Sequence, residues 1–272
     1  MNQAADGSSP PPAAWQPLTF GGVAAFATAR LGRLMLVGIL AAVIFGAGLV
    51  WFLERDYCPV ILQAIQKMPE TARVAAGRLQ GVPNTLISES KPLAIAVTPE
   101  SAADIGQGAD VQFQLRQTDF CIGSIFRPDW GLEFDYGGGA SLKLSRSSLE
   151  PWWGAWQPVL LTGAGLGAVV VLLAAWVLLA AIYMAPAKFI AWFADRNLSW
   201  GGAMRLCFAA MAPGALVMTF AVFLYGCHAI DLVHLSFFWL AHLVMGWVYV
   251  AGGVWVSPRL FPRAPDKNPF AS

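Results

Sequence analysis

The chain has 272 residues, of which 57% are hydrophobic and only 12% are charged, about half of the ~25% charged residues usual in soluble domains. A net charge of +1 excludes the strongly basic character of most nucleic-acid-binding proteins, and four cysteines are too few for a small disulfide-rich scaffold. This composition predicts an α-helical membrane protein with one polar region.

The first apolar segment follows a polar start. Residues 1–17 contain GSSPPPAAWQP, which buries too little apolar surface to fold, so we expect a disordered cytoplasmic tail. Residues 18–33 combine aromatic side chains with Arg30 and Arg33, a pattern typical of an interfacial helix on the membrane surface. The uncharged residues 34–53 can cross a hydrocarbon core of about 30 Å. Because this apolar run is longer than the ~7–15 residues of a signal peptide, we expect a retained span.

The polar residues 54–150 are long enough to form a small domain between the first and second spans. Apolar residues recur at helical spacing from Val60 to Met68, and Pro69 ends this predicted helix. The later segments predict strands, because they alternate apolar and polar residues or are short and apolar: 93–97, 111–115, 120–122, 130–136 and 141–144. We therefore expect a small α+β extracytoplasmic domain with one helix and an antiparallel sheet.

Three further apolar segments predict the remaining spans. No charged residue occurs between Glu150 and Lys188, and aromatic residues near both ends of this run place the second span at 158–182. Residues 206–225 and 235–256 are the predicted third and fourth spans. In the third span, Pro213 predicts a kink, since proline removes a backbone donor.

The charge distribution predicts the orientation. With both termini cytoplasmic, residues 183–205 form a cytoplasmic loop, 228–234 an external hairpin and 257–272 a cytoplasmic tail. This arrangement puts eight basic residues inside, Arg30, Arg33, Lys188, Arg196, Arg205, Arg259, Arg263 and Lys267, against the three acids Asp6, Asp195 and Asp266. The excess follows the positive-inside rule. We expect a multi-pass membrane protein with both termini in the cytoplasm.

Cys58 and Cys121 are the only two cysteines of the polar domain. In an oxidising compartment two such cysteines are expected to pair, so we predict a Cys58–Cys121 disulfide, with two buried and unpaired thiols as the alternative. A redox function is disfavoured because the chain lacks C-x-x-C spacing.

The densest polar group near the predicted membrane is formed by His228, Asp231 and His234, followed by His242. On a helix, His228 and Asp231 would share a face, as would Asp231 and His234. Imidazole and carboxylate groups suit zinc, but a solvated hairpin explains the same residues. These three are therefore weak metal candidates, and we expect neither a metal nor a cofactor.

No set of residues predicts a catalytic centre. The four predicted spans contain no Asp, Glu, Lys or Arg, which argues against a proton-coupled carrier and an intramembrane aspartyl protease. Glu133 and Asp135 alternate with apolar residues, so we expect them on the solvent face of a strand rather than as a hydrolytic pair.

Two stretches carry a family resemblance: 68–100 (MPETARVAAGRLQGVPNTLISESKPLAIAVTPE) and 197–216 (NLSWGGAMRLCFAAMAPGAL). They resemble a bacterial family of multi-pass membrane proteins of unknown function, distantly related to the Yip-type membrane proteins. The resemblance implies an extracytoplasmic domain inserted into a helical bundle, and it names no reaction. The cysteine pair and the His/Asp hairpin depart from the family's pattern. Some such proteins resemble companions of sugar-uptake systems.

Three hypotheses of function follow. The preferred one is a non-enzymatic integral membrane protein whose extracytoplasmic domain binds a protein partner or assists an envelope complex. Its expected partners are the lipid bilayer and this protein partner, with no nucleic acid. The first alternative is an accessory or permease-like component of a neutral-solute transport system, with sugar as the candidate solute. The second is a metal- or thiol-dependent membrane enzyme that uses the His/Asp hairpin or the cysteine pair.

Overall fold

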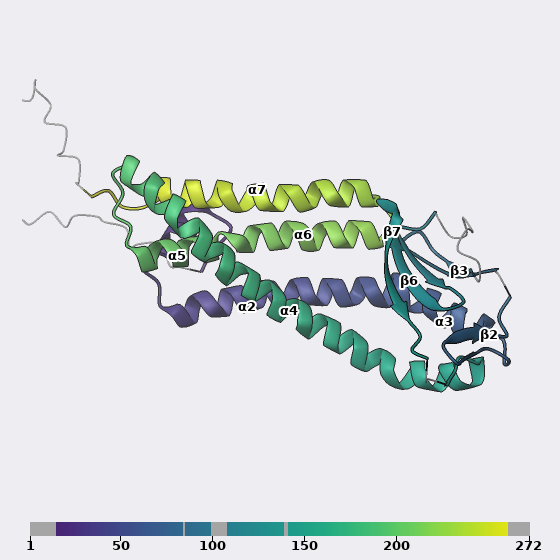
Figure 1. Ribbon diagram of the computed structural model, residues 1–272. Helices are drawn as coiled ribbons and strands as arrows, with labels where there is room; N and C mark the ends of the chain where they lie inside the picture. Colours follow the sequence, from purple (N-terminus) through teal and green to yellow (C-terminus); the bar gives the residue numbers. More distant parts are fainter. Residues whose placement is uncertain (1–14, 84, 99–107, 139–140, 261–272) are drawn as a thin grey trace, which may run out of the picture. The chain divides into compact units, whose positions relative to one another are not determined.

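The computed structural model describes residues 15–83, 85–98, 108–138 and 141–260 (Figure 1). Most of the predicted tail 1–17 and residues 261–272 of the predicted C-terminal tail therefore lie outside the described residues.

The chain divides into two compact units, each described by itself. The first, called the helical unit, comprises Met1–Ala47, Gly167–Val222 and Val233–Ser272. The second, called the sheet unit, comprises Gly48–Leu166 and Phe223–Leu232.

Within the described residues, four helical segments are long and apolar enough to cross a membrane: Leu31–Lys67, Arg146–Phe193, Trp200–Gly226 and Leu232–Val256. Each contains one of the four predicted spans. By length and composition, the structure thus agrees with a four-span membrane protein.

Three of these segments differ from their predicted bounds. Helix α2 (Leu31–Phe52) continues without interruption into a π-helix, η1 (Leu53–Tyr57), and then into α3 (Cys58–Lys67). Helix α4 (Arg146–Phe193) begins before its predicted span and extends well past it, and α5 (Trp200–Ala209) begins inside the predicted loop. Only 194–199 connect these two helices, so much of the predicted cytoplasmic loop 183–205 is helical.

The third span is broken, as the proline predicts. Helix α5 ends at Ala209, and α6 (Met211–Gly226) begins after Ala210. Pro213 has no N–H for the carbonyl of Ala209, and its ring disfavours a regular helix at that carbonyl. Helix α7 (Leu232–Val256) follows, and close contacts between Gly214 and His242 show that α6 and α7 pack against each other.

The predicted interfacial helix 18–33 is shorter and more buried than expected. Helix α1 covers only Phe20–Ala25, and the Thr19 side chain caps it by accepting a hydrogen bond from the Gly22 N–H. Val23 and Phe26 are fully buried in the core of the helical unit. Val23 contacts the backbone at Gly253 of α7 closely, so the apolar face of α1 is covered by protein.

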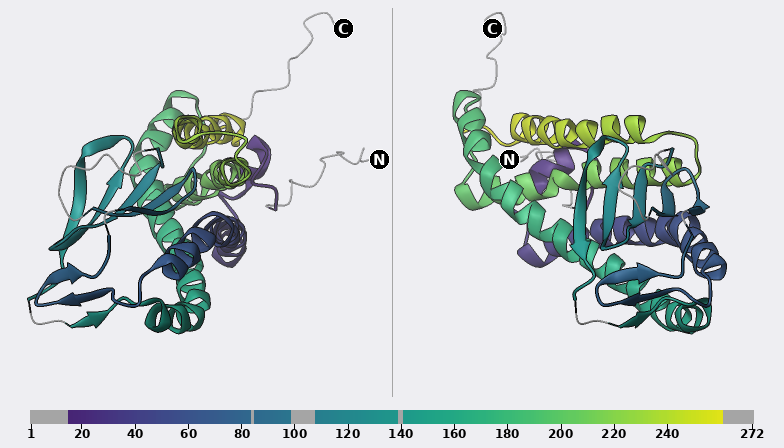
Figure 2. Two further views of the ribbon diagram at one scale, coloured as in Figure 1. Left: turned by 90° about the vertical axis from the view of Figure 1, so that its right-hand side faces the viewer. Right: turned by 45° about the vertical axis from the view of Figure 1, so that its right-hand side comes forward.

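Within its described residues, the sheet unit contains eight strands in two sheets (Figure 2). The strands are β1 (Arg73–Ala75), β2 (Arg78–Gln80), β3 (Thr85–Glu89), β4 (Leu93–Val97), β5 (Val111–Leu115), β6 (Asp119–Ser124), β7 (Arg127–Asp135) and β8 (Leu142–Lys143). The three-stranded sheet has the order β2-β1-β8, and the five-stranded sheet has the order β3-β4-β5-β6-β7. Five strands correspond to predicted segments, whereas β1, β2 and β3 were not predicted.

The five-stranded sheet is mixed, so the prediction of an antiparallel sheet is wrong at one pair. Strand β4 pairs with β5 in parallel, with Leu93 opposite Val111 and Val97 opposite Leu115. A parallel pair needs a crossover connection of about a dozen residues or more, and residues 98–110 provide this length. The other neighbouring pairs in this sheet are antiparallel.

The core of the sheet unit lies between α3, the small sheet and one end of the large sheet. Ala64 and Met68 of α3, Val74 and Leu79 of the small sheet, and Val97 of β4 belong to one buried apolar cluster. Ile95, Leu115 and Tyr136 pack against its edge. This core covers β3, β4 and the end of β5.

Candidate functional site

The strands β5, β6 and β7 align three phenylalanines on one side of the large sheet. Phe120 lies opposite Leu115 of β5 on one side and opposite Phe134 of β7 on the other. The ring centroids of Phe113 and Phe120 are 6.1 Å apart with planes 8° from parallel. Those of Phe120 and Phe134 are 4.8 Å apart and 13° from parallel. Cross-strand aromatic pairs of this kind stabilise a sheet.

Much of this apolar side lies outside the core. Val97 in β4 is fully buried, whereas Leu132 and Phe134 in β7 are 49% and 44% exposed. Phe113 and Phe120 are half-buried between them. We call these four residues, Phe113, Phe120, Leu132 and Phe134, the aromatic face. A contiguous exposed apolar surface of this kind is typical of a binding site.

The aromatic face reaches the edge of the sheet. Strand β7 is the last strand in the sheet order, and its nine residues make it the longest of the eight strands. An edge strand has backbone N–H and C=O groups on its outer side that can pair with another strand. The hairpin that joins β6 and β7 adds two exposed apolar residues, Ile125 at 40% and Phe126 at 56%.

The opposite side of β6 and β7 is charged. Arg116 Nη1 lies 2.7 Å from Glu133 Oε1 and 3.6 Å from Asp119 Oδ1. The Tyr136 hydroxyl donates to the Arg116 carbonyl oxygen over 3.1 Å. Glu133 and Asp135 are exposed, as the alternation predicts. Because the Glu133 side chain is 62% exposed, its ion pair contributes little stability.

Cys58 and Cys121 are both free, so the predicted Cys58–Cys121 disulfide is wrong. Cys58 packs with Ile65 and Trp153 in a small buried cluster. Cys121 lies in β6 against the backbone of Gly131 in β7, on the side of the sheet that carries Glu133. The two thiols therefore occupy separate sites. Burial raises the pKa of the Cys121 thiol, although the nearby Arg116 lowers it in part.

A polar cluster, buried except for the half-exposed His228, lies where helices and strands of the sheet unit meet. Asp56 is in η1, and its Oδ1 lies 3.3 Å from Nε2 of His228 in the turn between α6 and α7. The Tyr225 hydroxyl at the end of α6 donates to Asp110 Oδ2, directly before β5. We call these four residues, Asp56, Asp110, Tyr225 and His228, the polar cluster. They connect η1 and the α6–α7 turn with the large sheet.

The geometry of the polar cluster is unusual in two respects. Asp56 is only 6% exposed, and its Oδ2 has no hydrogen-bond partner among the described residues. His228 has a φ of 57°, a left-handed conformation that costs energy in non-glycine residues and that concentrates at functional sites. The π-helix that carries Asp56 belongs to a class of distortion that is frequent at such sites.

The predicted metal candidates do not act as one set. His228 lies in a turn rather than on a helix and pairs with Asp56, whereas His234 lies in α7. Within the described residues, no group of three or more His, Cys, Asp or Glu side chains is placed to hold a metal ion. His242, singled out in the fourth span, has its Nδ1 against the Trp239 carbonyl oxygen of its own helix.

Sequence reasoning missed most of the polar cluster. Asp56 and Asp110 lie far apart in the sequence, and their partners come from the α6–α7 turn and the end of α6. The available signal was the position of Asp56, three residues beyond the predicted first span. An acid so close to a span end either reaches water or acquires a partner.

The chain matches no protein-family model, and neither a curated protein nor a solved structure matches it significantly.

Proposed function

We propose that this is a non-enzymatic integral membrane protein whose sheet unit lies outside the bacterial cytoplasmic membrane and binds a protein partner through the aromatic face. The observation that carries the proposal is the exposure of Leu132 and Phe134 next to a continuous row of phenylalanines. Exposing this apolar area to water is unfavourable by about 25 cal/mol per Å², and a partner that covers it recovers this free energy.

The occupant that best fits this surface is an extended apolar segment of another protein. Strand β7 offers an unpaired edge for an added strand, and the aromatic face continues directly to that edge. In such complexes backbone hydrogen bonds provide affinity and alternate side chains provide specificity. A role in an envelope complex is consistent with this mode of binding.

Charge favours a protein over the bilayer as the occupant. Surfaces that lie on membranes are typically bordered by Lys and Arg. The aromatic face itself contains no Lys or Arg, and the neighbouring Arg116 lies on the opposite side of the sheet, where it is paired with Glu133. The residues of the aromatic face therefore do not supply the basic border that would favour an anionic lipid surface.

Site-specific photocrosslinking tests the proposal in cells. A photoreactive amino acid replaces Leu132 or Phe134 in the full-length protein, and replaces Glu133 as the matched control. Glu133 is also exposed but lies on the other side of the same strand. We expect positions 132 and 134 to capture the same protein, identified by mass spectrometry, and Phe134→Ser to reduce its co-purification. Equal capture from position 133, or adducts with lipid only, would contradict the proposal.

The two alternatives remain predictions. The family resemblance is the support for the transport-accessory function, and an enzyme function would use the free thiols or the Asp56–His228 pair. A carboxylate–imidazole pair orients a base, but hydrolysis also needs a nucleophile or an activated water.

A further inference from the structure

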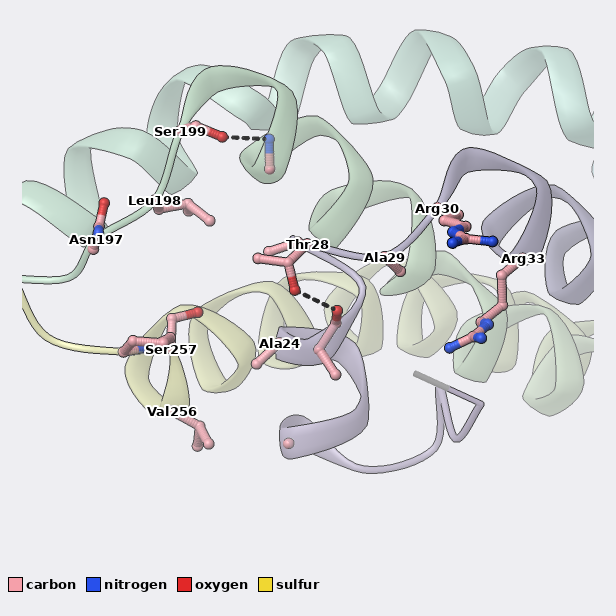
Figure 3. A pocket seen from close by; sticks show the side chains of 15 residues that line it. Ala24, Thr28, Ala29, Arg30, Arg33, Asn197, Leu198, Ser199, Val256 and Ser257 are labelled. Atoms are coloured by element: carbon pink, nitrogen blue, oxygen red, sulfur yellow. Dashed lines mark hydrogen bonds between the residues drawn. The ribbon is translucent and has the colours of Figure 1, made fainter. Parts of the chain in front are cut away.

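The helical unit contains a cavity of about 920 Å³ at the ends of three of its helices (Figure 3). The segment from α1 to the start of α2 forms one wall, the start of α5 forms a second, and the end of α7 forms a third. Small residues such as Ala24, Ala29 and Gly202 keep the space open. Its polar groups include the guanidinium groups of Arg30 and Arg33.

Arg30 and Arg33 add positive charge to the helical unit, and its described acidic residues do not neutralise that charge. Among the described residues, no carboxylate lies within 4.0 Å of either guanidinium. The described part of the helical unit holds the single acid Asp195 against six basic residues: Arg30, Arg33, Lys188, Arg196, Arg205 and Arg259. Arg33 stacks over the Trp15 ring at 4.7 Å, which orients its side chain but leaves its charge uncompensated.

Three of the other basic side chains donate hydrogen bonds to backbone carbonyl oxygens of the helical unit. Arg205 donates to the carbonyl oxygen of Ala29 over 2.8 Å and so fixes the wall that carries the two arginines. Arg196 donates to the carbonyl oxygen of Ser257 over 2.8 Å, and Lys188 donates to that of Leu198. These three contacts hold the walls together, whereas Arg30 and Arg33 remain available at the cavity.

Arg30 and Arg33 lie at the N-terminal end of helix α2, where positive charge is unfavourable. Arg30 directly precedes α2 and Arg33 lies in its first turn, where the helix dipole disfavours positive charge by about 0.3–1 kcal/mol per residue. No acid occupies the first turn of α2 or of α5. An anion in the cavity would relieve this repulsion, because both helices point their positive ends toward it.

Arginine pairs and the cavity's location indicate the class of anion. A guanidinium binds a phosphate with two parallel hydrogen bonds, and Thr28, Asn197 and Ser199 add hydroxyl and amide groups to the lining. In Figure 3, Asn197 and Ser199 lie on the opposite side of the view from the two arginines, and Thr28 lies between them. The cavity borders the first residues of α2 and the last residues of α7, both candidate membrane spans. Lipid headgroups occupy this level of a bilayer.

We propose that this cavity binds the phosphate group of an anionic lipid headgroup. Arg30 and Arg33 hold the phosphate, and the hydroxyl and amide groups contact the rest of the headgroup. Basic pockets between membrane helices on the cytoplasmic side are suited to such headgroups. This inference is independent of the proposed partner of the sheet unit.

Native mass spectrometry of the full-length protein in neutral detergent tests the proposal, with phosphatidylglycerol and phosphatidylcholine as the probes. We expect phosphatidylglycerol to bind with a stoichiometry of one and phosphatidylcholine much more weakly. Removing both charges by Arg30→Gln with Arg33→Gln should weaken phosphatidylglycerol binding about tenfold or more, since each basic residue contributes roughly 1 kcal/mol toward an anionic lipid.

Arg259→Gln is the matched control. It removes one charge near the end of α7 from an exposed residue that does not line the cavity. A second variant, Ala24→Phe, fills the cavity and removes no charge, and should also weaken binding. Thermal unfolding of each variant shows that it is folded.

Three results would overturn the proposal. Arg259→Gln could weaken binding as much as the double variant, which would indicate diffuse attraction. Ala24→Phe, shown to be folded, could bind the lipid normally, which would place the lipid elsewhere. Glycerol phosphate could displace the lipid at an equal concentration, which would make the cavity a site for a soluble phosphate.

Discussion

Replacing Gly131 by alanine tests both the packing of β6 on β7 and the state of Cys121. A Cβ at Gly131 would lie well under 3.0 Å from Cys121 Sγ, a distance that real Cβ atoms essentially never show. Gly131 is not among the glycines with positive φ, so the backbone itself accepts alanine. The clash with the sulfur atom is therefore the main effect of the substitution.

The expected magnitudes follow from the contacts. Overpacking costs about 1–3 kcal/mol, and restriction of the unfolded chain by alanine offsets about 0.4–1 kcal/mol of it, so Gly131→Ala should lose about 1–2 kcal/mol. Cys121→Ala removes a buried sulfur and should cost about 1 kcal/mol. In the double variant the new methyl group occupies the space of the sulfur. We expect a total loss below about 1 kcal/mol, which is a favourable coupling of about 1.5 kcal/mol.

Protease resistance of the sheet unit in the full-length, detergent-solubilised protein, measured against temperature, is a suitable assay. One kcal/mol corresponds to roughly 4–8 °C for a domain of about 100 residues. Additive losses in the double variant would refute the described packing. A loss of about 2–5 kcal/mol from Cys121→Ala alone would instead indicate that a disulfide had been removed.

Three further predictions concern the sheet unit and the α6–α7 turn. His228→Ala should destabilise the sheet unit by about 1 kcal/mol, because buried Asp56 loses its imidazole partner. The loss stays small because the half-exposed His228 is partly solvated, which weakens its interaction with Asp56. An equal loss of stability from His228→Ala in an Asp56→Ala background would contradict this coupling. Burial raises the pKa of Tyr136 to about 12. As pH rises from about 10 to 12, the unfolded chain therefore loses its phenol proton first and stability should fall; alkaline unfolding of Tyr136→Phe should show a smaller slope. Elemental analysis of the purified protein should find far less than one zinc per chain. Substituting His228, Asp231 and His234 together should not unfold the protein. Finding about one zinc per chain in the wild-type protein and none in this triple variant would support the enzyme alternative.

Apolar run length was sufficient to predict the spans, but it did not predict where helices end. The predicted second span stops at 182 because charge and aromatic residues mark an interface there, yet α4 continues to Phe193. A helix requires only its own hydrogen bonds and a tolerable sequence, so it can extend beyond the apolar region. The break at Ala210 was predictable because Pro213 acts locally.

The alternation of apolar and polar residues predicted which side chains share one side of the sheet. The strand order and the exposure of that side depend on long-range pairing and packing. The pattern of 111–115 places Phe113 and Leu115 on one side, as the structure shows. Alternation does not specify a parallel neighbour, and it does not reveal that the core covers Val97 but leaves Phe134 exposed. Exposure depends on what packs against a face, and α3 reaches only part of this sheet.

The candidate sites illustrate the same limit. The disulfide was inferred from the cellular compartment and the number of cysteines. Neither observation shows whether the two Cα atoms lie close enough for a disulfide. Asp56 and His228 meet because η1 and the α6–α7 turn are close in the fold, which no local pattern encodes. Arg30 and Arg33 were predictable as interfacial charges, whereas the cavity beside them depends on three helix ends.

Cysteine labelling of the full-length protein in intact cells tests the central claim, that the sheet unit faces away from the cytoplasm. The native Cys227 is exposed and is first replaced by serine. Glu133→Cys then reports on the sheet unit, and Arg259→Cys reports on the end of α7, since both residues are exposed. A membrane-impermeant thiol reagent should label position 133 in intact cells and position 259 only after lysis. Labelling of position 259 but not of position 133 in intact cells would contradict the topology and, with it, the proposed partner-binding function.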